Sequence, residues 1–121
     1  MIVGAHSIIY AEDADRARAF FRDVLHYPYV DAHGGWLIFK LPPGELGIHP
    51  TEPSDSGRHE LYLMCDDIDQ TVKDLEARGV EFTGPVTDAG FGRLVTLKVP
   101  GGGDLGLYEP RHPLAVNLPD Y

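Results

Sequence analysis

The chain has 121 residues, of which 43% are hydrophobic and 24% are charged, so we expect one globular domain rather than a disordered or fibrous chain. Ten Lys and Arg residues oppose nineteen Asp and Glu residues, and the net charge of −9 argues against binding to nucleic acid or to anionic membranes. No apolar run reaches the roughly 18 residues of a membrane-spanning helix, and the first residues do not resemble a secretory signal. Cys65 is the only cysteine, so no internal disulfide can form and a cytoplasmic location is expected.

The first half of the chain is predicted to form a strand, a helix and three further strands. The helix begins after Asp13, its predicted N-cap, and its apolar residues recur every three or four positions through Leu25. Residues with strand composition, bounded by turn residues, predict β-strands at 2–10, 28–32, 35–41 and 45–49.

The second half repeats this order. A helix is predicted to begin after Asp67 and to end before Gly79, a residue type that is typical of helix C-termini. The predicted strands are 60–65, 80–83, 93–99 and 104–108. His6 precedes Asp13 by seven residues, just as Glu60 precedes Asp67, which supports two pseudosymmetric modules.

These observations give a domain organisation for the whole chain. We expect a single domain, 1–121, with module one at about 1–50, a linker at about 50–58, module two at about 59–110 and a C-terminal tail at 111–121. The linker is polar and rich in turn residues, as a joint between two modules should be.

Five motifs carry a resemblance to a known family. They lie at residues 6–13, 19–25, 61–69, 75–80 and 100–110. They are similar to motifs of the vicinal oxygen chelate superfamily, which includes glyoxalases, bleomycin-resistance proteins and extradiol dioxygenases. The resemblance covers about residues 2 to 110. It implies an α+β fold in which two βαβββ modules form a curved mixed sheet, each module an open half-barrel beside a pocket.

The resemblance also implies where a metal would bind. Metal-dependent members take ligands from the first and last strand of each module, and the matching positions here are His6, Gly47, Glu60 and Gly106. Glycine offers no side-chain ligand, so no metal cofactor is expected. An alternative remains, because His49 shares a strand face with Gly47. His6, His49 and Glu60 would then hold one divalent metal: Fe, Mn, Zn or Ni.

Aromatic side chains are predicted to line the pocket, because small-molecule sites are mostly apolar with a few placed polar groups. Tyr62 and Tyr108 each lie two residues from a metal-ligand position on the same strand, so they face the same side of the sheet and are favoured as pocket residues. The predicted ligand-binding residues are Tyr10, Trp36, His49, Tyr62 and Tyr108, with Phe91 as a further aromatic candidate.

Glu60 and His6 are the predicted catalytic residues if the protein is an enzyme. A carboxylate among apolar neighbours is costly unless it is paired or used, and Glu60 could act as a general base. The alternative is a structural role, in which Glu60 pairs with Arg58, with Arg93 or with a histidine, or accepts a hydrogen bond from Tyr62.

Two functions follow from this reasoning. The leading one is metal-independent binding or sequestration of a small, partly aromatic molecule, as in antibiotic resistance. The competing one is a metal-dependent dioxygenase, lyase or isomerase. A homodimer is expected in either case, because the thin domain exposes sheet edges and the family members that it resembles close their barrels across a two-fold axis.

Overall fold

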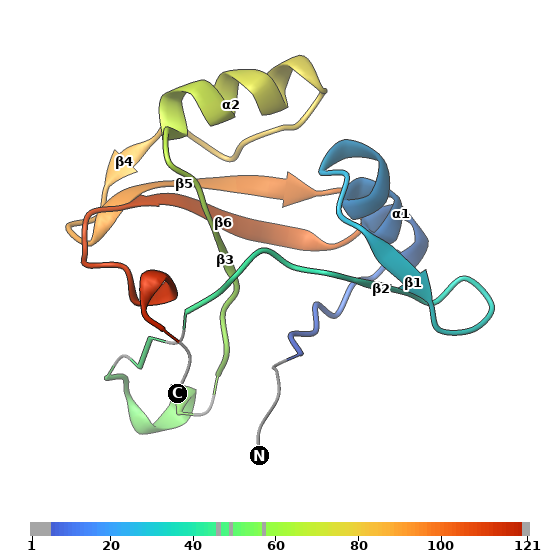
Figure 1. Cartoon of the computed structure of the whole chain (residues 1–121), viewed down its shortest axis with the longest axis horizontal. Helices are drawn as coiled ribbons and strands as arrows, with labels where there is room; N and C mark the ends of the chain where they lie inside the picture. The colour runs from blue at the N-terminus through green and yellow to red at the C-terminus, as the bar shows by residue number, and fades with distance from the viewer. Residues whose placement is uncertain (1–5, 46, 49, 57, 120–121) are drawn as a thin grey trace.

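A four-stranded sheet organises the second half of the chain (Figure 1). The computed structural model describes residues 6–45, 47–48, 50–56 and 58–119. The strands are β3 (Tyr62–Met64), β4 (Thr87–Asp88), β5 (Gly92–Val99) and β6 (Gly103–Pro110). They lie in the order β3-β6-β5-β4, with β3 parallel to β6 and β5 antiparallel to both of its neighbours.

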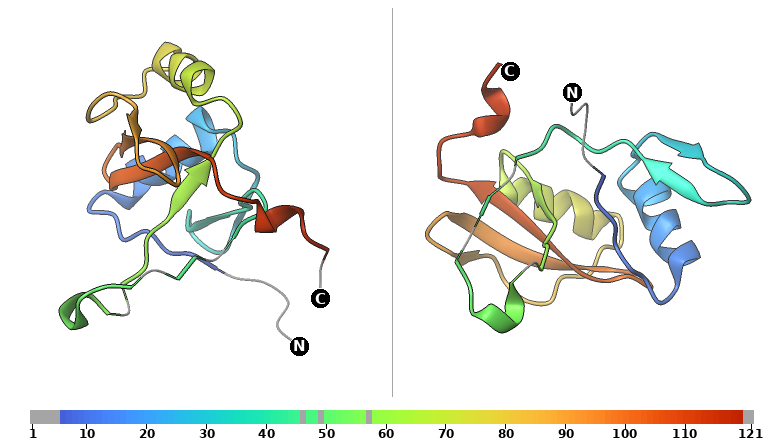
Figure 2. Two further views of the ribbon diagram at one scale, coloured as in Figure 1. Left: turned by 90° about the vertical axis from the view of Figure 1, so that its left-hand side faces the viewer. Right: turned by 90° about the horizontal axis from the view of Figure 1, so that it is seen from below.

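A separate antiparallel hairpin lies in the first half. It consists of β1 (Tyr29–Asp31) and β2 (Leu37–Phe39). Gly34 and Gly35 turn the chain with positive φ angles, and the Asp31 carboxylate accepts a hydrogen bond from the Gly35 N–H at 3.2 Å. Figure 2 shows this hairpin extending beside α1, away from the four-stranded sheet.

Both predicted helices are present, and both predicted N-caps are confirmed. The first helix, α1 (Ala14–Ala19), continues directly as the π-helical turn η1 (Phe20–Val24), and the second helix is α2 (Ile68–Ala77). Two short 3-10 turns are η2 (Pro53–Asp55) and η3 (Ala115–Asn117). Asp13 and Asp67 each accept a hydrogen bond at 3.1 Å from the backbone N–H three residues on. Gly79 follows α2 with φ +87°, as a helix C-terminus favours. No helix in the described part of the chain is both long and apolar enough to span a membrane.

The apolar core lies between the helices and one face of the four-stranded sheet. Side chains of α2 and of the α1–η1 segment pack there against alternate residues of β5 and β6. The buried set is Ala17, Phe20, Phe21, Ile68, Leu75, Val80, Val95, Leu97, Val99, Leu105 and Leu107. Together with the mixed sheet, this arrangement confirms the α+β class.

The turn between β5 and β6 joins the two halves of the chain. The Gly101 carbonyl accepts a hydrogen bond from the Asp13 N–H at 2.9 Å. A Cβ at Gly101 would lie 2.6 Å from the Asp13 Cβ, and one at Gly102 would lie 3.2 Å from the Ala17 Cβ. Only residues without side chains allow the turn to approach the start of α1 this closely, which explains the glycines at 101 and 102. Gly103 meets no such neighbour among the described residues, and its φ of +78° favours glycine there.

Several predicted strands are wrong. Of the predicted strand 2–10, residues 6–10 form no strand, and of the predicted strand 45–49, neither do residues 45, 47 and 48; positions 2–5, 46 and 49 lie outside the described residues. A strand exists only through a neighbour with which it can pair, and the described residues offer these segments no such neighbour. Of the predicted strand 80–83, only an isolated bridge between Phe82 and Leu97 is present. The edge strand that pairs with β5 is β4, which comes later in the chain. Gly84 and Pro85 interrupt the pairing, since proline lacks the N–H that a strand ladder needs.

Candidate functional site

The face of the four-stranded sheet that points away from α2 carries the candidate site; we call it the open face. In the strand register, Tyr62 lies beside Gly106, and Met64 lies beside Tyr108. Leu107, the next residue along β6, points the other way and is buried in the core. The alternation of side chains therefore places Tyr62 and Tyr108 together on the open face.

Aromatic rings gather around Tyr108. Its ring centroid lies 5.9 Å from that of Tyr62 and 5.5 Å from that of Phe91, with interplanar angles of 83° and 73°. These are edge-to-face contacts, the geometry that aromatic pairs prefer. The ring of His112 lies 5.9 Å from Tyr108 on a further side. Tyr62 is 38% exposed and Phe91 46% exposed, so the cluster offers apolar surface to a ligand.

The ring of Tyr62 lies directly over Gly106. A Cβ built at Gly106 would lie 2.3 Å from Cδ1 and 2.4 Å from Cε1 of Tyr62. The space that a side chain at position 106 would fill is therefore already taken by an aromatic ring. In metal-dependent members of the family that the sequence resembles, this position is expected to hold a metal ligand; here the ring of Tyr62 covers it.

Glu60 lies beside this cluster and is paired. Its carboxylate accepts a hydrogen bond from Arg58 Nη1 through Oε1 and another from the Tyr62 hydroxyl, at 3.0 Å, through Oε2. Partial burial, and then the hydrogen bond to Glu60, raise the pKa of Tyr62. Arg93, the other cation considered for Glu60, pairs instead with Asp69 at 2.8 Å. Among the pairings considered for a structural role of Glu60, the structure shows those with Arg58 and with Tyr62.

A second polar group borders the cluster and was largely missed by sequence reasoning. His112 Nδ1 lies 2.8 Å from the Pro113 carbonyl, which can only accept, so this nitrogen is the donor. The other ring nitrogen of His112, Nε2, lies 3.1 Å from the Tyr108 hydroxyl, with which it shares a hydrogen bond. The carboxylate of Glu45 lies 4.0 Å from the same nitrogen and accepts the Val116 N–H at 3.0 Å. Partial burial, followed by the charge of Glu45, raises the pKa of Tyr108.

These contacts fold the C-terminal tail onto the candidate site. The Arg111 N–H also donates to the Phe91 carbonyl at 2.9 Å. No pattern in the sequence singles out His112. Its contact with Glu45 joins residues that are far apart in the chain, and no local signal reports such a contact.

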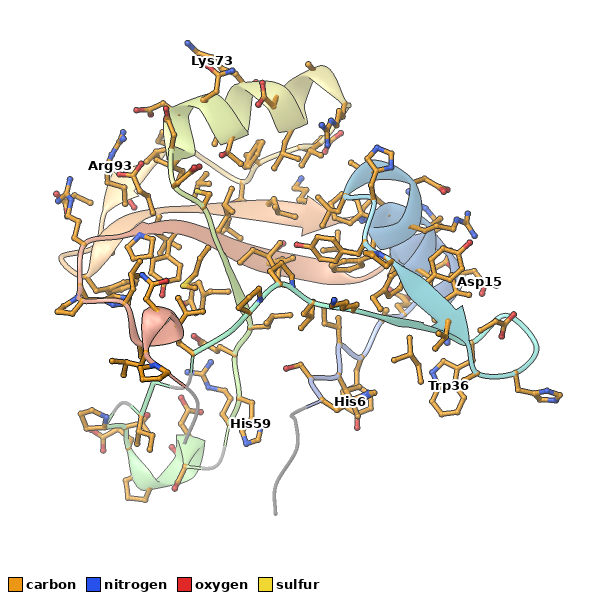
Figure 3. The ribbon with its side chains drawn as sticks, in the orientation of Figure 1. His6, Asp15, Trp36, His59, Lys73 and Arg93 are labelled. Carbon is orange, nitrogen blue, oxygen red and sulfur yellow. The ribbon has the colours of Figure 1, made fainter. Side chains whose placement is uncertain are left out.

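The other predicted site residues that the structure describes, Tyr10, Trp36 and His6, make no ring contact with this cluster. Tyr10 is 90% exposed, and Trp36 is 59% exposed at the start of β2. Figure 3 shows Trp36 on the hairpin side of the molecule, opposite to Arg93, and His6 on the N-terminal segment. Among the described residues, His6 makes no hydrogen bond or ion pair with another residue. His49 lies outside the described residues, so its predicted role is untested.

The structure describes two of the three residues of the alternative metal site, His6 and Glu60. Both carboxylate oxygens of Glu60 accept hydrogen bonds from neighbouring donors, and the ring of Tyr62 fills the space at Gly106. Within the described ranges, no three His, Cys, Asp or Glu side chains come together as metal ligands would. The set of His6, His49 and Glu60 remains a prediction, because it includes an undescribed position.

Solved structures with a similar fold include both binders and enzymes. The chain is 26% identical to TnmS3, an antibiotic binding protein from Streptomyces sp. CB03234, with a TM-score of 0.61 over 91% of this chain and 98% of that one. It is 29% identical to a superfamily member from Sphaerobacter thermophilus, with a TM-score of 0.59 over 89% and 98%. A lactoylglutathione lyase from Agrobacterium tumefaciens, 21% identical, has a TM-score of 0.63 over 88% and 92%, which shows the shared fold alone.

The comparison with curated proteins finds no match. The model of one protein family matches residues 4–110, nearly the whole chain and both of its halves. This agrees with the motifs, with the order of elements in the second half and with the similar solved structures. The chain belongs to the glyoxalase/bleomycin resistance protein/dioxygenase superfamily.

Proposed function

We propose that the protein binds and sequesters a small, partly aromatic molecule on the open face, without a metal, in the manner of a resistance protein. The observation that carries this proposal is the edge-to-face cluster of Tyr62, Phe91 and Tyr108. Its rings are partly exposed and held in place by one another, so a flat ligand can stack on them with little loss of side-chain entropy. The antibiotic binding protein among the similar structures supports the same kind of ligand.

Polar groups at the edge of the cluster would orient the ligand. Glu60 stands on one side of Tyr108 and the pair of His112 and Glu45 on another. The carboxylate of Glu60 accepts hydrogen bonds from Arg58 and Tyr62, which fix its position beside the cluster. We therefore assign Glu60 to orientation rather than to proton abstraction.

The proposal is tested by measuring ligand affinity in variants of the cluster. A thermal-shift screen of polycyclic and heteroaromatic compounds supplies the probe, and titration calorimetry measures its Kd. We expect Tyr108→Ala to weaken binding by at least about tenfold, since a buried, well-packed aromatic anchor commonly contributes more than 1 kcal/mol. Trp36→Ala is the matched control, an exposed aromatic outside the cluster, and should change Kd by less than about twofold.

Glu60→Gln separates binding from catalysis. In the proposed binder this variant should weaken affinity only slightly, and no chemical change of the compound should be detected by mass spectrometry with either protein. If the original chain converts the compound and Glu60→Gln binds it equally well but loses on the order of 10² or more of the turnover, the sequestration proposal is wrong and Glu60 is a general base.

We also propose that the protein is a cytoplasmic homodimer. β3 is an edge strand of the four-stranded sheet, next to the open face. Large apolar side chains are exposed elsewhere, with Tyr10 90%, Ile48 91%, Val30 65% and Ile8 63% accessible. Natural proteins seldom leave so many apolar groups and a free strand edge uncovered, and a second copy is the commonest cover.

The dimer is checked by size-exclusion chromatography with light scattering. At micromolar concentration we expect about twice the monomer mass of 13.3 kDa. Val30→Asp should shift the equilibrium toward monomer, because it places a charge among the exposed apolar groups, whereas Lys73→Asp on the surface of α2 should not. A mass of one chain across the whole concentration range would contradict the dimer.

A further inference from the structure

A cavity of about 520 Å³ lies where the two halves of the chain meet, at the other end of the sheet from Tyr108. It is bordered by η1, by the C-terminal end of α2 and by the β5–β6 turn, and we call it the junction cavity. The pair of Val99 and Gly103 closes the β5–β6 ladder at the junction cavity (Figure 1). Tyr108, which pairs with Leu94, lies near the opposite end of this ladder. Its volume is within the usual range of small-molecule sites.

The floor of the junction cavity is apolar and rigid. Phe20 from η1, Val80 after α2 and Val99 from β5 line it, and each is less than 9% exposed. All three belong to the hydrophobic core, so their positions are fixed by packing on the side away from the cavity. Such a floor can cover the apolar body of a ligand without rearranging.

The rim of the junction cavity is cationic, although the chain as a whole is strongly acidic. Arg16, Arg78 and Lys98 stand around it, and only two carboxylates, Glu81 and Asp104, share the rim. These three are a substantial part of the ten Lys and Arg residues in a chain of net charge −9. Cations gathered at one cavity of an acidic protein favour a negatively charged ligand there over the rest of the surface.

The three cationic side chains differ in their hydrogen-bond and ion-pair partners within the protein. Arg78 donates from Nη1 to the Val24 carbonyl at 3.1 Å, which fixes the guanidinium at the rim and leaves its other N–H groups for a ligand. Lys98 Nζ lies 3.8 Å from the Glu81 carboxylate. Arg16 has no carboxylate partner for its guanidinium among the described residues; its hydrogen bond to Asp13 runs through the backbone N–H. Arg16 is therefore the group best placed to take a new anion.

We propose that the junction cavity is a second binding site, for an amphipathic carboxylate that joins one carboxylate group to a compact aryl or alkyl body. The body packs on Phe20, Val80 and Val99, and the carboxylate lies toward Arg16. A guanidinium binds a carboxylate through two parallel hydrogen bonds, which gives the site its preference for this anion. The site is independent of the open face, so it does not depend on the function proposed there.

The test uses 2-naphthoate as the probe and its neutral analogue, 2-naphthalenemethanol, for comparison, in 1H–15N spectra of the full chain. We expect naphthoate to shift the amide signals of Val80, Val99 and Gly101, and to bind at least fivefold more tightly than the alcohol. Arg16→Gln should weaken naphthoate binding at least fivefold. Arg18→Gln, with the same change in net charge on the same helix, is the matched control, because Arg18 pairs with Asp15 outside the junction cavity, and it should stay within twofold.

Three results would overturn the proposal. One is equal weakening by Arg16→Gln and Arg18→Gln, which would mean that only the overall charge matters. Another is equal affinity for naphthoate and the alcohol. The third is a set of shifts confined to Tyr62, Phe91 and Tyr108, which would place the probe on the open face. Tyr108→Ala serves as a further check, because it should leave naphthoate binding in the junction cavity unchanged.

Discussion

Replacing Leu97 with alanine is expected to lower the free energy of unfolding by about 3 kcal/mol. Leu97 lies in β5 at the centre of the core and is fully buried. The change removes buried apolar atoms and leaves a cavity, and substitutions of this kind cost about 2 to 5 kcal/mol. Urea denaturation followed by circular dichroism measures the loss.

Leu118→Ala is the matched control for this measurement. The substitution is the same, but the side chain is 68% exposed in the C-terminal tail, so the expected loss is below about 0.5 kcal/mol. Similar losses in the two variants would show that β5 does not hold the core as described.

Gly106→Val is expected to destabilise the protein by about 2 kcal/mol and to disturb the open face. A Cβ at this position meets the ring of Tyr62, and the ring must turn away. It then loses its edge contact with Tyr108 and its hydrogen bond to Glu60. Inserting atoms into occupied space commonly costs about 1 to 3 kcal/mol. Chemical denaturation gives the stability, and the ring signals of Tyr62 report the movement.

Two further variants isolate the clash. Gly47→Val changes the other glycine at a family ligand position, where none of the described residues has an atom within 4 Å of the added Cβ, and it should be nearly neutral. The double variant Gly106→Val with Tyr62→Ala should lose less stability than the sum of its single changes, because the ring that clashes is gone. Full additivity would contradict the proposed contact between the two residues.

The parts of the fold that were predictable are those that depend on local chemistry. Asp13 and Asp67 cap their helices through hydrogen bonds that span three residues, and Gly79 ends α2 through its own backbone angle. The alternation of side chains along β3 and along β6 is local as well, but Tyr62 and Tyr108 share a face only through the register in which these two strands pair. The helix caps, the helix end and the alternation could each be predicted from a few neighbouring residues.

The features that were missed depend on contacts between distant segments. Residues 6–10 have the composition of a strand, but a strand needs a partner, and the described part of the chain provides none for them. The contact of His112 with Glu45 brings the tail to the end of module one, which no spacing rule anticipates. Trp36 was placed at the pocket from its position after two glycines, yet the turn of the hairpin holds it apart from the aromatic cluster.

The position of the C-terminal tail affects where this family's domain boundary should be drawn. Similarity to the family ends at residue 110, the last residue of β6. A chain cut there would keep every strand, but the carboxylate of Glu45 would lose the Val116 N–H, and the Tyr108 hydroxyl would lose its hydrogen bond with the His112 imidazole. The part of the chain that matches the family is therefore shorter than the part that would bind the proposed ligand. In this chain, residues beyond the family match therefore help to shape the candidate site, while the matched residues supply its scaffold.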